Sequence, residues 1–211
     1  MIEIKKLTFN PFQVNTYVVY DSTKECIIVD PGCSSKAELE VLTSFIAENA
    51  LKPQKIVLTH PHIDHILGVV AVAEHYNLKV YSHEKSLEII SQGGAYAASY
   101  GMSSFESFEP DFLLSEGQEI EFGNSKLKII YVPGHADGSI CLYDEEDKQL
   151  ITGDVLFQGS IGRTDLPTGN YTLLIDGISE KLLTLPDETV VFPGHGGNTT
   201  IKEERETNPF F

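Results

Sequence analysis

Four apolar, strand-like segments of this sequence are each followed directly by histidine or aspartate. They read KIVLTHPHIDH, KIIYVPGH, QLITGD and TVVFPGH. Strand ends that point the same way place their following loops along one edge of a sheet, where the ligand sites of α/β folds gather. We therefore expect one cluster of polar side chains, made of His60, His62, Asp64, His65, His135, Asp154 and His195.

The first of these segments has three histidines and one aspartate within the six positions from His60 to His65. Neutral imidazole and carboxylate are the usual ligands of catalytic zinc, and they also suit iron and manganese. Burying so many polar groups without a metal would be costly. Seven donors are too many for one ion and suit two, if one carboxylate bridges them. The sequence predicts two divalent metal ions, with Zn²⁺ preferred over iron or manganese.

The spacing inside this segment favours a division between the two metals. His60 and His62 are two positions apart, so on an extended stretch their side chains point the same way. Asp64 and His65 follow a turn at the start of a predicted helix, so they point elsewhere. Two ions about 4 Å apart hold a bridging hydroxide at neutral pH and polarise a carbonyl or phosphoryl oxygen. The chemistry indicated is hydrolysis.

The remaining sequence predicts strands interspersed with helices, which favours sheets inside and helices outside. Strands are predicted at 2–9, 14–21, 25–32, 55–60, 78–83, 117–122, 126–135, 139–154 and 188–195, and helices at 35–50, 64–76, 84–91, 171–186 and 199–208. The segment 92–110 is small, polar and aromatic. Two interpretations of it stay open: a lid over the pocket, with Tyr96 as a substrate contact, or ordinary packing.

Composition narrows the classes of partner. The net charge of −16 argues against nucleic acid and anionic membranes as partners. No run is apolar for the roughly 18 residues of a membrane span, and the N-terminal stretch has no signal-peptide core, so we expect a cytoplasmic protein. Its three cysteines form no C-x-x-C pair and are expected to be small buried hydrophobes. The expected partner is a small-molecule substrate, and the sequence does not indicate the oligomeric state.

Several motifs resemble a known family. THPHIDH, VPGHADGS, ITGDVLF and FPGHG resemble, in order, the motifs of the metallo-β-lactamase-fold hydrolases, and VDPG resembles their first motif. GDVLFQGSIGRTDLPTGN and FPGHGGNTTIKEERETNPF are similar to the glyoxalase II-like branch, the hydroxyacylglutathione hydrolases and their short bacterial relatives. The resemblance implies an α+β fold, an αββα sandwich of two mixed β-sheets flanked by helices. It implies a single domain over 1–211 that lacks the extra C-terminal helical domain of full glyoxalase II.

The resemblance also implies roles for individual residues. One metal would be held by His60, His62 and His135, the other by Asp64, His65 and His195, with Asp154 bridging. Asp30 would support the first loop. The implied activity is hydrolysis of hydroxyacylglutathione-like thioesters through a metal-bridging hydroxide, which Asp64, the catalytic candidate, would orient. Arg163 is a candidate for supporting the site, and a structural salt bridge with Asp165 is its alternative.

Two other enzyme activities remain open at this point. A persulfide dioxygenase of the same fold would use one iron, held by His60, His135 and Asp154. A metallohydrolase of another ester or amide, such as a β-lactam, would use the same fold with different loops. A nucleic-acid-processing enzyme is disfavoured by the acidic charge. A non-catalytic binder is disfavoured by the complete set of seven donors.

Overall fold

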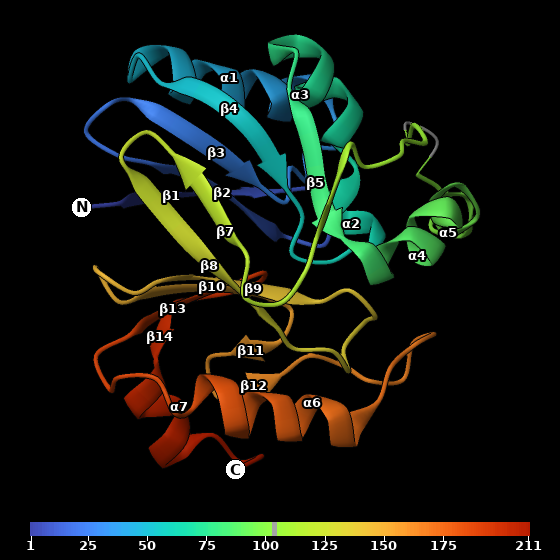
Figure 1. The fold of residues 1–211 in the computed structure, drawn as a ribbon. Helices are drawn as coiled ribbons and strands as arrows, with labels where there is room; N and C mark the ends of the chain where they lie inside the picture. The colour runs from blue at the N-terminus through green and yellow to red at the C-terminus, as the bar shows by residue number, and fades with distance from the viewer. Residues whose placement is uncertain (103–104) are drawn as a thin grey trace.

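Two six-stranded β-sheets lie face to face in the computed structural model, which describes residues 1–102 and 105–211. Helices cover the outer face of each sheet, so that the layers follow the order helix, sheet, sheet, helix (Figure 1). Each sheet mixes parallel and antiparallel neighbours. The expected αββα sandwich of two mixed sheets, and with it the α+β class, is confirmed.

The first sheet is built from the N-terminal half of the chain. In spatial order its strands are β1 (Glu3–Phe9), β2 (Val14–Tyr20), β3 (Glu25–Val29), β4 (Lys52–Val57), β5 (Lys79–His83) and β6 (Phe112–Leu114). β1, β2 and β3 pair antiparallel, whereas β3, β4, β5 and β6 pair parallel. The parallel strands β3 and β4 therefore end at the same edge of the sheet.

The second sheet is built from the C-terminal half. Its spatial order is β14 (Thr199–Thr200), β13 (Val190–Pro193), β10 (Gln149–Gly153), β9 (Ile140–Asp144), β8 (Ser125–Tyr131) and β7 (Glu119–Phe122). Only β10 and β13 pair parallel, so their C-terminal ends also share one edge. A separate hairpin joins β11 (Leu156–Phe157) and β12 (Ser160–Ile161).

Helices follow the strands on both outer faces. Above the first sheet in Figure 1 lie α1 (Lys36–Glu48) and α3 (Val69–Tyr76). To its right lie α2 (Ile63–Ile66), α4 (Leu87–Ser91) and α5 (Gly93–Ser99), and a 3₁₀ turn at Glu84–Ser86 precedes α4. Below the second sheet lie α6 (Tyr171–Gly177), continued by a π-helical turn at Ile178–Leu182, and α7 (Ile201–Thr207). In the part of the chain that is described, no helix has the length and apolar character needed to cross a membrane.

Alternating side chains explain why the strands form two stacked sheets. On β3, Ile27 and Val29 point into the layer between the sheets, whereas Cys26 and Ile28 point toward the helices. On β9, Ile140 and Leu142 enter the same central layer, and Cys141 packs on the α6 side. β3 and β9 are apolar on both faces because each lies inside a sheet that is covered on both sides. The three cysteines are free and buried, as expected.

The predicted helix over 64–76 is broken into α2 and α3. The break lies at Gly68, whose backbone N–H donates to the carbonyl of Pro31 at 2.8 Å. A Cβ at this position would lie 2.3 Å from Cys33 Sγ, so the close approach requires glycine. Contact with the Pro31 loop therefore replaces the continuous helix that the apolar periodicity predicts.

Candidate metal centre

The loops after β4, β8, β10 and β13 meet at the edge where the two sheets face each other. His60 Nε2 lies 3.3 Å from His135 Nε2, although 75 positions separate them in the chain. His195 Nε2 lies 3.1 Å from Asp64 Oδ2. The structure thus brings all seven side chains of the predicted cluster together.

The donor atoms of the described residues form three groups, two of which share no residue. His60, His62 and His135 offer ligand atoms within 4.8 Å of one another, and so do Asp64, His65 and His195. The local backbone explains the division. His62 is extended, with φ −65° and ψ 147°, and precedes the first turn of α2, which carries Asp64 and His65. The third group, Asp30, His60 and His65, lies across these two. The division of the ligands between two metals therefore stays a prediction.

Asp154 lies between the two groups. Its Oδ1 is 3.3 Å from His65 Nε2, and its Oδ2 is 3.5 Å from His195 Nε2 and 3.7 Å from His135 Nε2. The carboxylate is brought here by the tight approach of two parallel strand ends. A Cβ on Gly194 would lie 2.1 Å from Asp154 Oδ1, so this strand end has room only for glycine.

Two buried polar atoms at the centre, His65 Nε2 and Asp154 Oδ1, make no hydrogen bond, although they lie 3.3 Å apart as an ion-pair contact. A buried polar atom without a partner loses the hydrogen bonds it makes in water, so native structures rarely leave one unexplained. Imidazole nitrogen and carboxylate oxygen are also the donor types that zinc, iron and manganese take. The residues present therefore fit divalent metal ions.

A network around Asp30 fixes the first loop. Asp30 Oδ1 accepts the backbone N–H of Thr59 at 2.7 Å, and Oδ2 accepts the Thr59 hydroxyl at 2.5 Å and Nδ1–H of His65 at 2.9 Å. Because the Thr59 hydroxyl donates to Asp30, it accepts from His60 Nδ1 at 3.1 Å. Both rings therefore carry their proton on Nδ1 and present Nε2 to the centre.

Two further histidines are oriented by backbone carbonyls. His135 Nδ1 donates to the carbonyl of Arg163 at 2.8 Å, and His195 Nδ1 donates to the carbonyl of Phe12 at 3.1 Å. These contacts again leave Nε2 facing the centre. An outer hydrogen bond of this kind is the usual companion of a metal-binding histidine.

In the group of His60 and His62, the pKa shifts favour neutral imidazoles, the form that binds metal. In the other group, they favour a protonated His65. Burial, followed by repulsion from neighbouring imidazoles, lowers the pKa of His60 well below its ordinary value and that of His62 to about 3. Burial opposes protonation of His65, yet Asp154 and Asp64 outweigh it and raise its pKa. Burial alone would raise the pKa of Asp154, but His65 lowers it. Without metal, positive charge gathers on His65 between two carboxylates, where a cation would replace it.

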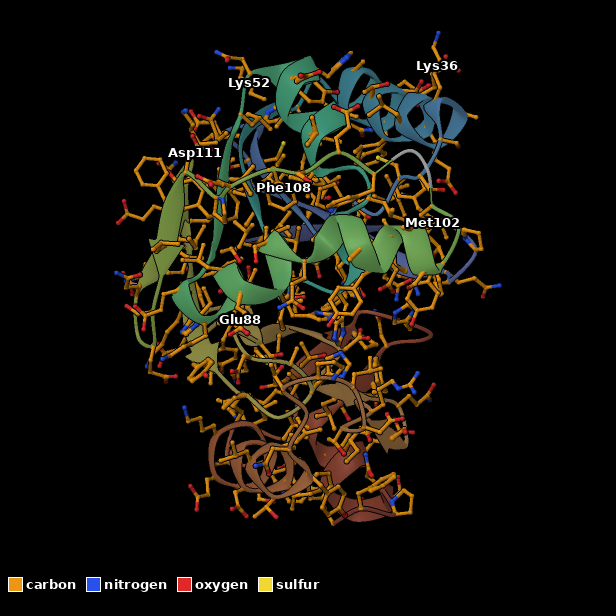
Figure 2. All side chains as sticks on the ribbon, turned by 90° about the vertical axis from the view of Figure 1, so that its right-hand side faces the viewer. Lys36, Lys52, Glu88, Met102, Phe108 and Asp111 are labelled. Atoms are coloured by element: carbon orange, nitrogen blue, oxygen red, sulfur yellow. The ribbon has the colours of Figure 1, made fainter. Side chains whose placement is uncertain are left out.

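A cavity of about 240 Å³ opens onto this centre. Its lining comes from the loop before β2, from the α4–α5 segment and from the loop after β12; it comprises Phe12, Pro61, His62, Ile63, Asp64, Ile89, Gly93, Tyr96, Tyr100, His135, Asp154, Arg163, Leu166, Pro167 and His195. Figure 2 views the side on which α4 and α5 run along the boundary between the two halves of the molecule, with Glu88 on α4 and Met102 just beyond α5. The cavity is large enough for a small organic substrate.

The segment 92–110 shows the ordinary packing that was one of its two interpretations, apart from Ser103 and Ser104, which lie outside the described residues. The lid, with Tyr96 as a substrate contact, stays a prediction. Met102, Phe105 and Phe108 pack against the core beneath the helices of the first sheet. Tyr96 packs there too and also lines the cavity, as does Tyr100, whose ring meets Phe12 edge-on at 5.6 Å. The segment is thus a packed wall of the cavity.

Arg163 forms the salt bridge with Asp165 that was its alternative interpretation, and its role in supporting the site stays a prediction. Its carbonyl holds His135, its side chain lines the cavity, and its guanidinium pairs with Asp165. Sequence reasoning missed Thr59 and Asn10. Asn10 Nδ2 donates to the carbonyls of Gly32 and Asp64 and so joins two loops of the site. Thr59 stands directly before the histidine motif, which was an available signal, whereas Asn10 acts from 54 positions away.

Known proteins resemble this chain in sequence and in architecture. Residues 9–195 match the sequence family described as the Metallo-beta-lactamase superfamily. Hydroxyacylglutathione hydrolase GloC of Haemophilus influenzae is 36% identical, over 99% of this chain and 98% of that protein. The crystal structure of the B3 metallo-beta-lactamase BLEG-1 superposes with a TM-score of 0.89 at 38% identity, covering 99% of each chain. The di-iron-bound form of TTHA1623 superposes with a TM-score of 0.88 at 35% identity, covering 98% of this chain and 100% of that one.

Proposed function

The chain belongs to the metallo-beta-lactamase superfamily, and from that premise we propose that it is a dinuclear metal-dependent hydrolase that cleaves thioesters. The observation that carries the proposal is the pair of buried atoms His65 Nε2 and Asp154 Oδ1 at the centre of the donor cluster, which lie 3.3 Å apart and make no hydrogen bond. A buried imidazole nitrogen and a buried carboxylate oxygen that make no hydrogen bond are available to bind cations, which supports a catalytic role for metal.

The ligand roles are part of the proposal. His60, His62 and His135 hold one ion, Asp64, His65 and His195 hold the other, and Asp154 contributes to both. The 3.3 Å to 3.7 Å contacts of Asp154 with histidines of both groups support its shared position. When bound, such a pair of ions lowers the pKa of water and polarises a carbonyl oxygen. Zinc is the preferred metal here, and a relative that binds two irons supports iron as well.

The chain's own residues position the reactants. Asp64 is held by His195 at 3.1 Å and by the anchoring of its carbonyl to Asn10, so its carboxylate accepts a proton from attacking water in a fixed direction. Phe12, Ile63 and Leu166 give the cavity apolar walls, which exclude bulk water and strengthen electrostatic interactions within it. Asp30 fixes the ring of His65.

A thioester suits this arrangement because its leaving thiolate needs little help from a general acid. The cysteines offer no alternative nucleophile, since all three are buried and burial raises the pKa of Cys26 and Cys33 to about 12. The hydroxyacylglutathione hydrolase relative supports a glutathione-like thiol as the first substrate to try.

The test joins metal content to turnover. Protein purified without chelator is analysed for zinc, iron and manganese, and hydrolysis of S-lactoylglutathione and simpler thioesters is then measured. We expect two equivalents of metal per chain and activity that a chelator removes and added metal restores. One equivalent of iron together with oxygen uptake on a glutathione persulfide would contradict the proposal in favour of the dioxygenase.

A second candidate function is amide hydrolysis of β-lactams. One observation favours it: the structure of a B3 metallo-beta-lactamase matches over 99% of this chain at 38% identity. Turnover of the chromogenic β-lactam nitrocefin by metal-loaded protein tests it directly. A kcat/KM for nitrocefin above that for every thioester would make β-lactam hydrolysis the primary activity.

A further inference from the structure

We propose that Glu204, near the C-terminus, is a positioning residue for the metal centre. Its buried carboxylate fixes the hairpin of β11 and β12, and this hairpin in turn holds Asp154 and His135 in place. The inference rests on the proposed function, because it concerns the same metal ions. It assigns a role in metal binding to a residue outside the donor cluster.

Glu204 lies on α7 and is completely buried. Its Oε1 accepts the hydroxyl of Thr199 at 2.6 Å, and its Oε2 accepts the backbone N–H of Gly159 at 2.9 Å and the side-chain amide of Asn208 at 2.7 Å. All three donors are neutral groups. One carboxylate therefore joins three segments of the chain: the tip of the hairpin, β14 and the C-terminal end of α7.

Stability alone is a weak reason for a carboxylate at this position. A buried charge loses its hydration, and well-packed apolar side chains of similar size often stabilise a fold equally well or better. The two elements that Glu204 joins, β11 and α7, already contribute Leu156 and Ile201 to one buried apolar cluster. What the carboxylate adds is direction, because its hydrogen bonds fix the tip of the hairpin relative to the helix.

The hairpin lies directly against the metal centre. It begins two positions after Asp154 and is followed by Gly162, where a Cβ would lie 1.9 Å from the carbonyl oxygen of Asp154 and 2.9 Å from Nδ1 of His135. The rings of Phe157 and His195 lie 6.3 Å apart between their centroids. A shift of the hairpin would therefore displace donors on both sides of the centre.

The tip of the hairpin is anchored from outside the hairpin. Each of its strands has two residues, and a two-stranded hairpin is at best marginally stable by itself. At the tip, Gly159 has φ +64° and donates its N–H to Glu204. Asn208 adds a second link, because its amide donates both to Glu204 and to the carbonyl of Ser160 at 3.2 Å. Two neighbouring residues of the tip are thus held by α7 and its C-terminal cap.

The experiment measures the metal centre without a substrate. Glu204→Leu replaces the carboxylate by an apolar side chain of similar size and leaves the N–H of Gly159 without its acceptor. We expect the Kd for Zn²⁺ to rise about tenfold, the lower end of the usual effect of losing a support of metal ligands. The visible absorption bands of bound Co²⁺ should also change, because these bands depend on the geometry of the ligands.

Glu204→Gln tests whether the acceptor matters rather than the charge. Its amide oxygen can face Gly159 and Asn208, while its amide nitrogen donates to the hydroxyl oxygen of Thr199. We expect the affinity for Zn²⁺ and the Co²⁺ bands to stay close to those of the wild type.

Arg205→Met is the matched control. Arg205 follows Glu204 on the same helix and also makes three hydrogen bonds, but to Leu183, Leu185 and Asp187. Its loss should lower the Tm by weakening the docking of α7, while the affinity for Zn²⁺ and the Co²⁺ bands stay at wild-type values. Equal metal measurements in Arg205→Met and Glu204→Leu, or wild-type measurements in folded Glu204→Leu, overturn the inference.

If circular dichroism shows that Glu204→Leu does not fold, Asn208→Ala takes its place, since it removes the second link to the hairpin. Altered Co²⁺ bands in this variant support the inference, and wild-type bands overturn it. A wild type that binds metal and cleaves no thioester rejects the proposed activity, and the metal measurements still decide the inference. A wild type that binds neither Zn²⁺ nor Co²⁺ overturns both.

Discussion

Asp30 is a buried carboxylate that does not line the cavity. Its hydrogen bonds nevertheless determine how two histidine rings face the metal centre. Its backbone has φ +49°, and its two oxygens accept from Thr59 and His65. Replacing one oxygen by an amide nitrogen places a donor against a donor at one of these contacts. The residue therefore acts through the orientation of two histidine rings.

We expect Asp30→Asn to lower metal affinity by about 10-fold to 100-fold, the usual effect of losing the partner of a metal-binding histidine. Competition with a chelator of known affinity measures the change. Asp21→Asn is the control, since Asp21 is also buried and accepts from Thr23, Asn124 and Ser125, but far from the centre. Equal metal affinities in the two variants would show that Asp30 has only a structural role.

Asp154→Ala tests the shared carboxylate. Because Asp154 contacts histidines of both groups, its removal is expected to strip both ions and abolish hydrolysis. Elemental analysis of the variant, purified without added metal, measures this. Asp111→Ala, which removes a surface pair with Lys79, should keep the wild-type metal content. Two equivalents in Asp154→Ala would contradict the shared role.

At the scale of elements, hydrogen bonds outside the metal centre join the loops that carry its ligand residues. Asn10 lies in the turn between β1 and β2, with φ +55°, and its amide donates to Gly32 at 2.8 Å and to Asp64 at 2.9 Å. One side chain therefore links that turn to the loop after β3 and to α2. Asp64 keeps its direction because its backbone is tied in this way.

We expect Asn10→Ala to lower the free energy of unfolding by about 2 kcal/mol, because two buried carbonyls lose their donor, and to reduce metal retention as well. Asn77→Ala is a close control, since Asn77 has φ +54° at the exposed end of α3. It shares the cost of a left-handed alanine, about 1 kcal/mol, without the bridging contacts. Urea unfolding and metal analysis distinguish the two variants. Equal free energies of unfolding and equal metal content in Asn10→Ala and Asn77→Ala would contradict the role of Asn10 in linking the loops.

Sequence predicted the long elements well, because their apolar residues repeat with the period of the structure. β2, β3, β8 and β9 lie where alternation and turn residues indicated strands. β11, β12 and β14 have two residues each, too short to show a period. The break between α2 and α3 depends on contact with Pro31, which no local pattern carries. The donor cluster was predictable because its residues follow apolar strands, whereas its supports come from distant loops.

At the scale of the whole molecule, three thiols are sealed inside the apolar layers. Burial raises the pKa of Cys26 and Cys33 to about 12 and raises that of Cys141 further. Raised pKa values keep these thiols neutral in the folded state while unfolded thiols ionise. Stability is therefore lost as pH rises above the pKa of the unfolded thiols.

We expect iodoacetamide at pH 8 to leave all three cysteines unmodified in native protein and to modify all three in urea. Mass spectrometry of the intact chain counts the modified thiols, and rapid modification of any one in the native protein would contradict its burial. A declining free energy of unfolding between pH 9 and 11 is the matching stability measurement.

Metal should stabilise the fold as a whole. An ion that binds only the folded state adds about 2.7 kcal/mol at a free concentration 100 times its Kd, which corresponds to a rise in Tm of roughly 5 to 10 °C for a chain of this size. Thermal unfolding with and without chelator measures the difference. In Asp154→Ala the chelator should have no effect, and a wild-type Tm indifferent to metal would contradict the donor cluster's role.

The path of the chain between the sheets has one more consequence. Among the described strands, every strand through β6 belongs to the first sheet. Every strand from β7 belongs to the second, apart from the separate hairpin of β11 and β12, so the backbone passes between the two large sheets once, at residues 115–118. The donors divide at the same place, with His60 to His65 before it and His135, Asp154 and His195 after it. A protease nick in that short connection would yield two fragments of similar length, which share the apolar layer between the sheets and would also share any bound cations. The denaturant needed to separate the fragments would then be higher in zinc than in a chelator.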